Sequence, residues 1–153
     1  HVIGLDLSFS NLQGQLHPNS TIFSLRHLQR LDLSYNYIFG DIPSTISHLS
    51  KLVSLNLGNF NLIDDYPNYP RMRIDPYPWK KLIQNATNLR ELNLDGMDMS
   101  CIGESSLSLL TNLSSSLISL RLRDTKLQGN LSSDILCLPN LQQLYLDHNK
   151  DLG

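Results

Sequence analysis

The chain has 153 residues, a formal net charge of −2 at pH 7 and a sequence pI near 6.2. This length is sufficient for one domain with a sizeable core. The charge balance excludes the strongly basic surface that nucleic-acid binding requires, and no run of Lys or Arg indicates a membrane-surface patch. No stretch approaches the roughly 20 apolar residues of a transmembrane helix. We therefore expect no nucleic-acid partner and no membrane contact by this segment itself.

Leucine makes up about a fifth of the residues, well above ordinary usage. Six segments fit the pattern L-x-x-L-x-L, and they begin at Val2, Leu28, Leu52, Leu89, Leu117 and Leu141. Most starts are separated by about 24 to 28 residues, within the leucine-rich range. The second and third leucines point to one side of a short strand, and only stacked neighbours can bury that apolar edge. The spacing predicts an α/β repeat solenoid, a leucine-rich-repeat horseshoe with a curved parallel β-sheet on its concave face and short helical, 3-10 or irregular convex segments.

Turn signals follow the predicted strands. Residues 44–49 of the second repeat are predicted to return as a helix or 3-10 segment. Asn36 and Asn149 are predicted to point inward, where an amide can bond backbone groups of adjacent turns. The equivalent positions of the other repeats hold different residues, so this asparagine ladder is incomplete.

Glycine, which lets the backbone turn where a Cβ would crowd it, stands at one shared position in four repeats: Gly14, Gly40, Gly129 and Gly153.

The third repeat contains an insertion at about residues 63–78. Its prolines and tyrosines, together with the doublet Asp64-Asp65, predict an irregular loop on the convex or lateral side. Residues 79–88 are predicted to form a short helix that leads into Leu89. The insertion could contact a partner, but a tolerated surface insertion with Trp79 packed into the core is the favoured interpretation.

The run from Asn36 to Pro43, in LDLSYNYIFGDIP, resembles the consensus of the plant extracellular subtype of leucine-rich repeat. The segments VIGLDLSFSNLQGQLHPNST, WKKLIQNATNLRELNLDG and LRDTKLQGNLSSDILCLPNLQQLYLDHNKDLG also resemble plant receptor-like proteins, so the resemblance covers the whole chain. It implies an ectodomain that follows a secretion signal and a cysteine-containing cap and precedes one membrane span without a kinase. In that family many members act in defence, some act in development, and they signal through partner receptor kinases.

We expect residues 1–153 to be a single solenoid fragment of six repeats, starting near 2, 28, 52, 89, 117 and 141, that lacks both the N-terminal and the C-terminal cap. Uncapped terminal repeats expose apolar core faces, which predicts poor solubility for the fragment alone.

Outward positions of the predicted strands, and the two positions after each strand, form the candidate binding face. Arg and Tyr are frequent anchors of protein interfaces. The alternative is that these repeats are scaffold and that the ligand contacts lie elsewhere. Positions expected to face outward include Ser34, Gly58, Asn59, Asp95 and Gly96. The ligand-binding candidates on the concave face are Arg30, Tyr35, Glu91, Asn93, Arg121, Arg123 and Tyr145.

Four N-x-S/T sequons are candidate glycosylation sites, and all lie outside the predicted strands. Sugars there would leave the concave sheet open to a partner. We favour Asn85 and Asn112, whereas Asn130 lies close to a glycine turn. The four asparagines are Asn19, Asn85, Asn112 and Asn130.

No catalytic motif, phosphate-binding loop or metal-ligand spacing is present, so we expect no enzyme, no cofactor and no metal. Asp64-Asp65 is interpreted as a solvated loop doublet. Cys101 and Cys137 occupy different places in their repeats and are predicted to be two separate buried thiols, although a disulfide between them stays an alternative.

These observations predict a binding segment of a plant cell-surface receptor-like protein, on the extracellular (apoplastic) side of the plasma membrane. The full-length protein would cross the membrane once. Its expected ligand is a peptide, glycan or protein, and the resemblance implies a partner receptor kinase and a role in defence. The alternatives are a secreted inhibitor of cell-wall polygalacturonases and the ectodomain of a leucine-rich-repeat receptor kinase.

Overall fold

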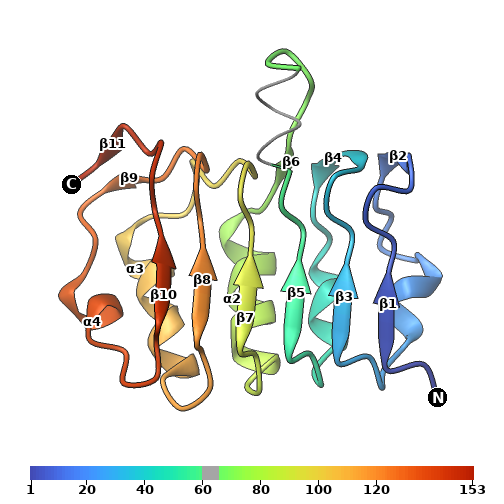
Figure 1. Ribbon diagram of the computed structural model, residues 1–153, viewed down its shortest axis with the longest axis horizontal. Helices are drawn as coiled ribbons and strands as arrows, with labels where there is room; N and C mark the ends of the chain where they lie inside the picture. Colours follow the sequence, from blue (N-terminus) through green and yellow to red (C-terminus); the bar gives the residue numbers. More distant parts are fainter. Residues whose placement is uncertain (60–65) are drawn as a thin grey trace.

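A six-stranded parallel sheet forms the concave face of the molecule (Figure 1). The computed structural model describes residues 1–59 and 66–153. Each strand is centred on the second leucine of its motif, and these leucines are in register from Leu5 and Leu31 through to Leu144. The predicted fold class is therefore confirmed. In spatial order the strands are β1 (Gly4–Asp6), β3 (Arg30–Asp32), β5 (Ser54–Asn56), β7 (Glu91–Asn93), β8 (Ser119–Arg121) and β10 (Gln143–Tyr145).

A second set of parallel strands runs along one lateral edge of the solenoid (Figure 1). They form where the chain turns away from the concave sheet, and they pair between successive repeats because the repeats stack in register. One group has the order β2-β4-β6, and the other pairs β11 with β9. The strands are β2 (Gln13–Gln15), β4 (Tyr37–Asp41), β6 (Met72–Arg73), β9 (Gln128–Gly129) and β11 (Asp151–Leu152).

Short helices lie behind the concave sheet and form the convex side (Figure 1). The 3-10 helix predicted after Pro43 is present as η2. The longest helix, α2, starts three residues before the predicted position because Pro76 occupies its first turn, where a missing N–H costs nothing. The convex elements are η1 (Thr21–Ser24), η2 (Ser44–His48), α2 (Pro76–Asn85), α3 (Glu104–Leu107), η3 (Ser108–Leu113) and α4 (Ser133–Leu136).

Leucine layers between the sheet and the convex helices form one continuous core. In the central repeats these leucines are almost fully buried, as at Leu31, Leu92 and Leu120. Leu5 and Leu144, in the first and last strands, are only partly buried because each has a neighbouring repeat on one side within this chain. Burial in this fold is thus supplied by the adjacent repeat, as the stacking argument requires.

Buried asparagine amides link the turns, as predicted for Asn36 and Asn149. The Asn36 Oδ1 accepts hydrogen bonds from the backbone N–H groups of Ser10 and Leu12, both at 3.0 Å. Its Nδ2 donates to carbonyls of both the first and the second repeat, including Leu7 at 2.8 Å. Asn149 makes the equivalent bonds between the fifth and sixth repeats. Backbone groups that no strand pairs are therefore satisfied inside the solenoid.

A residue with a left-handed backbone conformation (positive φ) ends the turn after most concave strands. The glycines predicted at turns also adopt positive φ, at Gly14, Gly40 and Gly129. Bulky residues in this region are uncommon and strained, so repeated use of the same place shows that the turn geometry is imposed by stacking. The residues are Phe9 (φ 52), Tyr35 (φ 55), Gly96 (φ 78), Asp124 (φ 49) and His148 (φ 64).

The described part of the insertion lies on the lateral side and is anchored there (Figure 1). The Tyr69 hydroxyl donates to the carbonyl of Tyr37 at 2.8 Å, and the two rings meet edge to face with centroids 5.6 Å apart. Trp79 is fully buried, and its Nε1 donates to the Ser106 carbonyl at 2.6 Å, which confirms its predicted core role. Asp64 and Asp65 lie outside the described residues, whereas residues 72–73 and 76–78 belong to β6 and α2 and are not irregular.

Both cysteines are exposed and unpaired, so their predicted burial is wrong. Cys101 lies in a turn, and its Sγ lies on the surface 2.8 Å from Nη2 of Arg73. Cys137 ends α4 at the surface. Their places in the repeats are turn and cap positions, which face solvent.

Replacing Asn36 by Ala tests the asparagine ladder. We expect the free energy of unfolding to fall by about 2–5 kcal/mol, because several backbone groups inside the solenoid lose a hydrogen-bond partner. Chemical denaturation of the full repeat array that contains this chain measures the change. The matched control is Asn88→Ala at an exposed position, and equal effects of the two substitutions would contradict the ladder's role.

Candidate functional site

Two adjoining hollows occupy the concave sheet. One, of about 470 Å³, spans β1, β3, β5 and Glu91 of β7, and the other, of about 220 Å³, spans β5, β7, β8 and Gln143 of β10. Both hollows are lined by Ser54, Asn56 and Glu91. The two hollows therefore form one continuous shallow groove across the strands. Side chains at alternate strand positions point into it because the intervening leucines point to the core.

Arg30 and Glu91 mark the middle of the groove. Their charged groups are 3.9 Å apart across Ser54, and both side chains are more than half exposed. An exposed pair at this distance contributes little stability, on the order of 0–1 kcal/mol. These two predicted site residues are therefore brought together by the sheet but remain accessible to a ligand.

Asp95 is the buried anion of the site. It follows β7, its side chain is only 2% exposed, and Oδ2 lies 3.1 Å from Nη2 of Arg121 and 2.9 Å from Nη2 of Arg123. Its Oδ1 also accepts the backbone N–H of Arg123 at 2.9 Å. The carboxylate thus holds both guanidinium groups of the next repeat, and the hydrogen bond with Asp95 raises the pKa of Arg123.

Tyr145 extends this cluster on the next strand. The guanidinium carbons of Arg121 and Arg123 lie 5.1 and 5.7 Å from the centre of its ring, within the range of cation–π contacts. The structure therefore brings together three residues that the sequence singled out. We define Asp95, Arg121, Arg123 and Tyr145 as the arginine cluster.

The local reason for the arginine cluster lies in the turn after each strand. Asp6, Asp32, Asn56 and Asn93 each accept the backbone N–H two residues later, as at Asp6 to Ser8 with a distance of 2.9 Å. The hydrogen bonds from Ser8 also lower the pKa of Asp6. Arg121 occupies the same strand position but cannot accept a hydrogen bond. Asp95 of the preceding repeat takes that role.

Sequence reasoning placed Asp95 on the outward face but missed its role. Ser34, Gly58, Asn59, Asp95 and Gly96 are all buried, so their predicted outward exposure is wrong. The chain turns inward directly after the strand, and neighbouring side chains cover these positions. Asn93, for example, lies over Gly58, where an added Cβ would be 2.7 Å from the Asn93 Oδ1. The available signal in the sequence was that Asp95 and Arg123 occupy equivalent positions of successive repeats, with Arg121 two residues before Arg123.

Tyr35 lies on the turn after β3 and not within the concave strands. Its ring stacks on that of Phe9, with centroids 4.5 Å apart and planes 12° apart. Phe9 itself is 72% exposed. The two rings occupy equivalent places in successive repeats and form an aromatic rim beside the groove.

All four sequon asparagines are exposed. Asn85 ends α2 and Asn112 lies in η3, both on the convex side. The Asn85 Nδ2 donates to the Ser47 carbonyl at 3.3 Å, so its side chain is already oriented. Asn19 precedes η1 and Asn130 follows β9, away from the concave sheet.

Within residues 1–59 and 66–153, no group of three or more His, Cys, Asp or Glu side chains is arranged to hold a metal ion. None of the helices in that part of the chain is both long and apolar enough to span a bilayer.

Comparison with known proteins identifies the family. A sequence model described as Leucine Rich Repeat matches residues 27–49. The chain is 36% identical over 176 aligned positions to Receptor-like protein Cf-9 of Solanum pimpinellifolium, covering 99% of this chain and 19% of that protein. It is 34% identical to Receptor-like protein 6 of Arabidopsis thaliana, covering 99% of this chain and 17% of that protein. Over nearly its whole length the chain is therefore similar to leucine-rich-repeat receptor-like proteins of plants.

Solved structures agree on the fold of this receptor-like segment. The ectodomain of the receptor kinase SOBIR1 from Arabidopsis thaliana aligns with a TM-score of 0.71 at 24% identity, covering 97% of this chain and 71% of that one. The TDR receptor aligns with a TM-score of 0.70 at 24% identity, covering 95% of this chain and 22% of that one. The chain spans about a fifth of the length of the receptor-like proteins that it matches.

Changing Asp95 to Asn tests the arginine cluster. The substitution keeps the shape but removes the charge, so we expect a loss of about 1–3 kcal/mol in the free energy of unfolding. Because the carboxylate is buried, moderate salt should reproduce little of this loss in the unchanged protein. Asp41→Asn, at an exposed position of β4, is the control for general charge removal. A loss no greater than the control's would show that Asp95 does not organise the cluster.

Proposed function

We propose that this chain is a ligand-binding ectodomain segment of a plant cell-surface receptor-like protein, and that its ligand is an extended peptide or protein segment. The single observation that carries this proposal is the continuous groove across the strands, with the arginine cluster at one end. A shallow, open groove lined by polar side chains suits a chain that lies across several repeats. It lacks the enclosed apolar walls typical of small-molecule sites.

Preorganisation supports this assignment. Arg121 and Arg123 are held by a buried carboxylate and by Tyr145, so little side-chain entropy remains to be lost when a partner binds. Arg and Tyr are also the residues most often found as interface anchors. Arg30, Glu91 and Asn93 then supply polar contacts along the groove, and Tyr35 supplies one at its rim. Binding, not catalysis, is the activity that such a surface favours.

The wider role that we propose is signalling in defence, through a partner receptor kinase at the extracellular side of the plasma membrane.

 The names of the relatives support a signalling role, since these relatives are receptor-like proteins. Among the similar folds, GASSHO1/SCHENGEN3 was solved in complex with CASPARIAN STRIP INTEGRITY FACTOR 2, and BIR3 was solved in complex with SERK2. In this proposal the full-length protein crosses the membrane once, outside the present segment.

Substitution of the groove anchors tests the proposed binding face. The complete repeat array, immobilised as the unchanged protein and as the double variant Arg121→Ala/Tyr145→Ala, is used to capture peptides and proteins from plant extracellular fluid. Captured components are identified by mass spectrometry, and their affinities are then measured by surface plasmon resonance. We expect a loss of roughly 10-fold or more in affinity, because central anchors of this type are commonly worth about 2 kcal/mol or more.

The control for this experiment is Arg26→Ala/Tyr77→Ala, which removes the same two residue types at exposed positions outside the groove. Unfolding curves of both double variants separate a loss of binding from a loss of folding. If every captured component binds the groove variant as tightly as the unchanged protein, the proposed binding face is wrong.

Glycan mapping tests the arrangement of the surface. We predict glycans at Asn85 and Asn112, because both side chains are exposed on convex elements and sugars there leave the groove uncovered. Enzymatic release in heavy-oxygen water, followed by peptide mass spectrometry of the secreted protein, marks each modified asparagine. Asn140, which has no sequon, controls for spontaneous deamidation. Unmodified Asn85 and Asn112 in a protein that carries sugars elsewhere would contradict this arrangement.

A further inference from the structure

A side chain at the base of the insertion reaches past the adjacent repeat. Arg71 belongs to the third repeat, yet its Nη1 donates to the backbone carbonyl of Asp124, in the fifth repeat, at 2.6 Å. Its Nη2 lies 3.1 Å from a carboxylate oxygen of the same residue. Because stacked repeats contact mainly their direct neighbours, an ion pair that passes over the fourth repeat needs a specific explanation.

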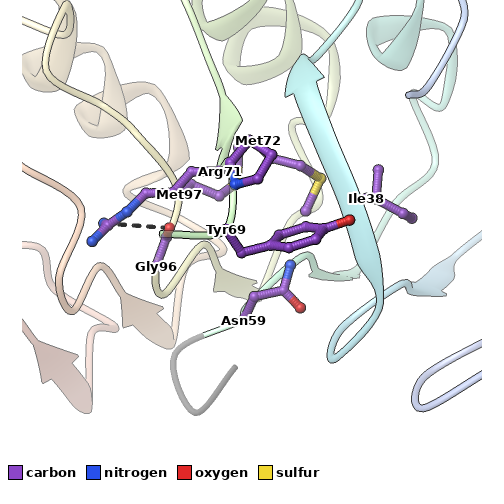
Figure 2. Close-up of a pocket in the computed structure, with 8 residues that line it drawn as sticks. Ile38, Asn59, Tyr69, Arg71, Met72, Gly96 and Met97 are labelled. Carbon is purple, nitrogen blue, oxygen red and sulfur yellow. Dashed lines mark hydrogen bonds between the residues drawn. The ribbon is translucent and has the colours of Figure 1, made fainter. Parts of the chain in front are cut away.

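The Arg71 side chain also contacts the fourth repeat. Figure 2 shows it extending from the base of the insertion, away from the Tyr69 ring, to the carbonyl of Gly96. Its Nη1 approaches that carbonyl at 3.5 Å. On the main chain, the Arg71 carbonyl accepts the N–H of Gly40, in the second repeat, at 3.1 Å. One residue of the insertion base therefore connects the second, fourth and fifth repeats.

Asp124, the acidic partner of Arg71, adopts a left-handed backbone conformation. Its φ is 49°, in a region that residues other than glycine seldom adopt, although Asp and Asn tolerate it better than most. Its N–H donates to the carbonyl of Asp147 at 3.0 Å. The side chains of Arg71 and Asp124 are 18% and 23% exposed, so solvent screens their ion pair only in part. Arg71 thus holds a turn whose conformation the isolated chain would disfavour.

This turn is directly joined to the arginine cluster, because Asp124 follows Arg123 in the chain. The Arg123 N–H is bonded to Asp95, and the Arg123 carbonyl accepts the N–H of Gly96 at 2.8 Å. Arg71 contacts the carbonyls of Gly96 and Asp124. The first of these residues is hydrogen-bonded to the Arg123 backbone, and the second is covalently attached to it. A displacement of either one moves the backbone from which the Arg123 guanidinium reaches its carboxylate.

We propose that Arg71 is a positioning residue of the groove: it fixes the turn after Arg123, and the insertion thereby supports the arginine cluster. The relevance of this support to ligand binding rests on the proposed function, whereas the support itself does not. The insertion base then does more than carry the chain into the helix that buries Trp79. When the Arg71 contacts are lost, the turn opens locally and the Arg123 guanidinium leaves Asp95 more often.

Chemical modification of arginines tests this role without any ligand. The complete repeat array is treated with phenylglyoxal, which reacts with accessible guanidinium groups, and peptide mass spectrometry follows each arginine with time. Arg71→Met keeps the length of the side chain but removes its charge and its donors. In this variant we expect Arg123 to react roughly 3- to 10-fold faster, because the loss of charge-assisted hydrogen bonds shifts a local opening equilibrium. Arg30, exposed in another part of the groove, should react at an unchanged rate.

The matched control is Arg73→Met. Arg73 also stands at the base of the insertion, but its guanidinium bonds the carboxylate of Asp75 at 2.8 Å. Arg123 should react at its normal rate in this control, and thermal unfolding of each variant shows whether the array is folded. Arg71→Lys, which keeps the charge, should give an intermediate rate. An unchanged Arg123 rate in Arg71→Met, or a rise that Arg30 or the control shares, would overturn the proposal.

Asp124→Asn supplies an independent check, since asparagine tolerates the left-handed conformation but lacks the charge. If Arg71 acts through Asp124, the two substitutions together should speed the modification of Arg123 little more than Arg71→Met does alone. Effects that multiply in full would show that the two residues act independently, which contradicts the proposed support.

Binding is measured separately in the surface plasmon resonance assay. Arg71→Met should weaken the binding of those captured components that the Arg121→Ala/Tyr145→Ala variant loses. Faster modification of Arg123 with unchanged binding by both variants would refute the groove as the binding face and leave the support of Arg123 standing. Unchanged modification of Arg123 would refute the role of Arg71, whatever the groove binds.

Discussion

The apolar edge of each repeat can be buried only by the next repeat, and the rest of the structure follows from this constraint. Because Leu31, Leu55 and Leu92 must lie in register, the strands that carry them are parallel and evenly spaced. Register in turn places every outward residue beside its equivalent in the adjacent repeat. The concave face is therefore a regular grid of outward side chains. A substitution at one repeat position affects the side chains at the equivalent positions of the adjacent repeats.

The same stacking creates a need for polar groups inside the solenoid. Turns leave backbone N–H and carbonyl groups unpaired, and Asn36 and Asn149 satisfy them across two repeats at a time. Where the insertion interrupts the third repeat, Asn59 stands one residue earlier, and its oxygen accepts the backbone N–H of Asn36. Irregularity in the sequence is thus expressed first in the hydrogen bonds between turns and not in the leucine core.

Regular spacing made much of this fold predictable. The leucine motifs gave the parallel sheet, the glycines gave left-handed turns, and Trp79 was correctly expected in the core. Side chains whose environment depends on a neighbouring repeat were harder to predict. The burial of Asp95, for example, depends on its contact with Arg121, 26 positions away. Spacing within one repeat carries no signal for such contacts.

The arginine cluster shows how the grid can be adapted for recognition. In four strands the last residue has a side-chain acceptor that bonds the backbone N–H two residues later and so stabilises the turn. In the fifth strand, β8, Arg121 stands at this position instead. The turn survives because Asp95 accepts the Arg123 N–H from the preceding repeat. A strand position that holds a turn acceptor in four other repeats therefore holds the cation of Arg121 here. The counter-charge of that cation is the buried carboxylate of Asp95. Since a buried carboxylate fixes both guanidinium groups while Tyr145 lies against them, Arg121, which lines the groove, keeps a defined direction there.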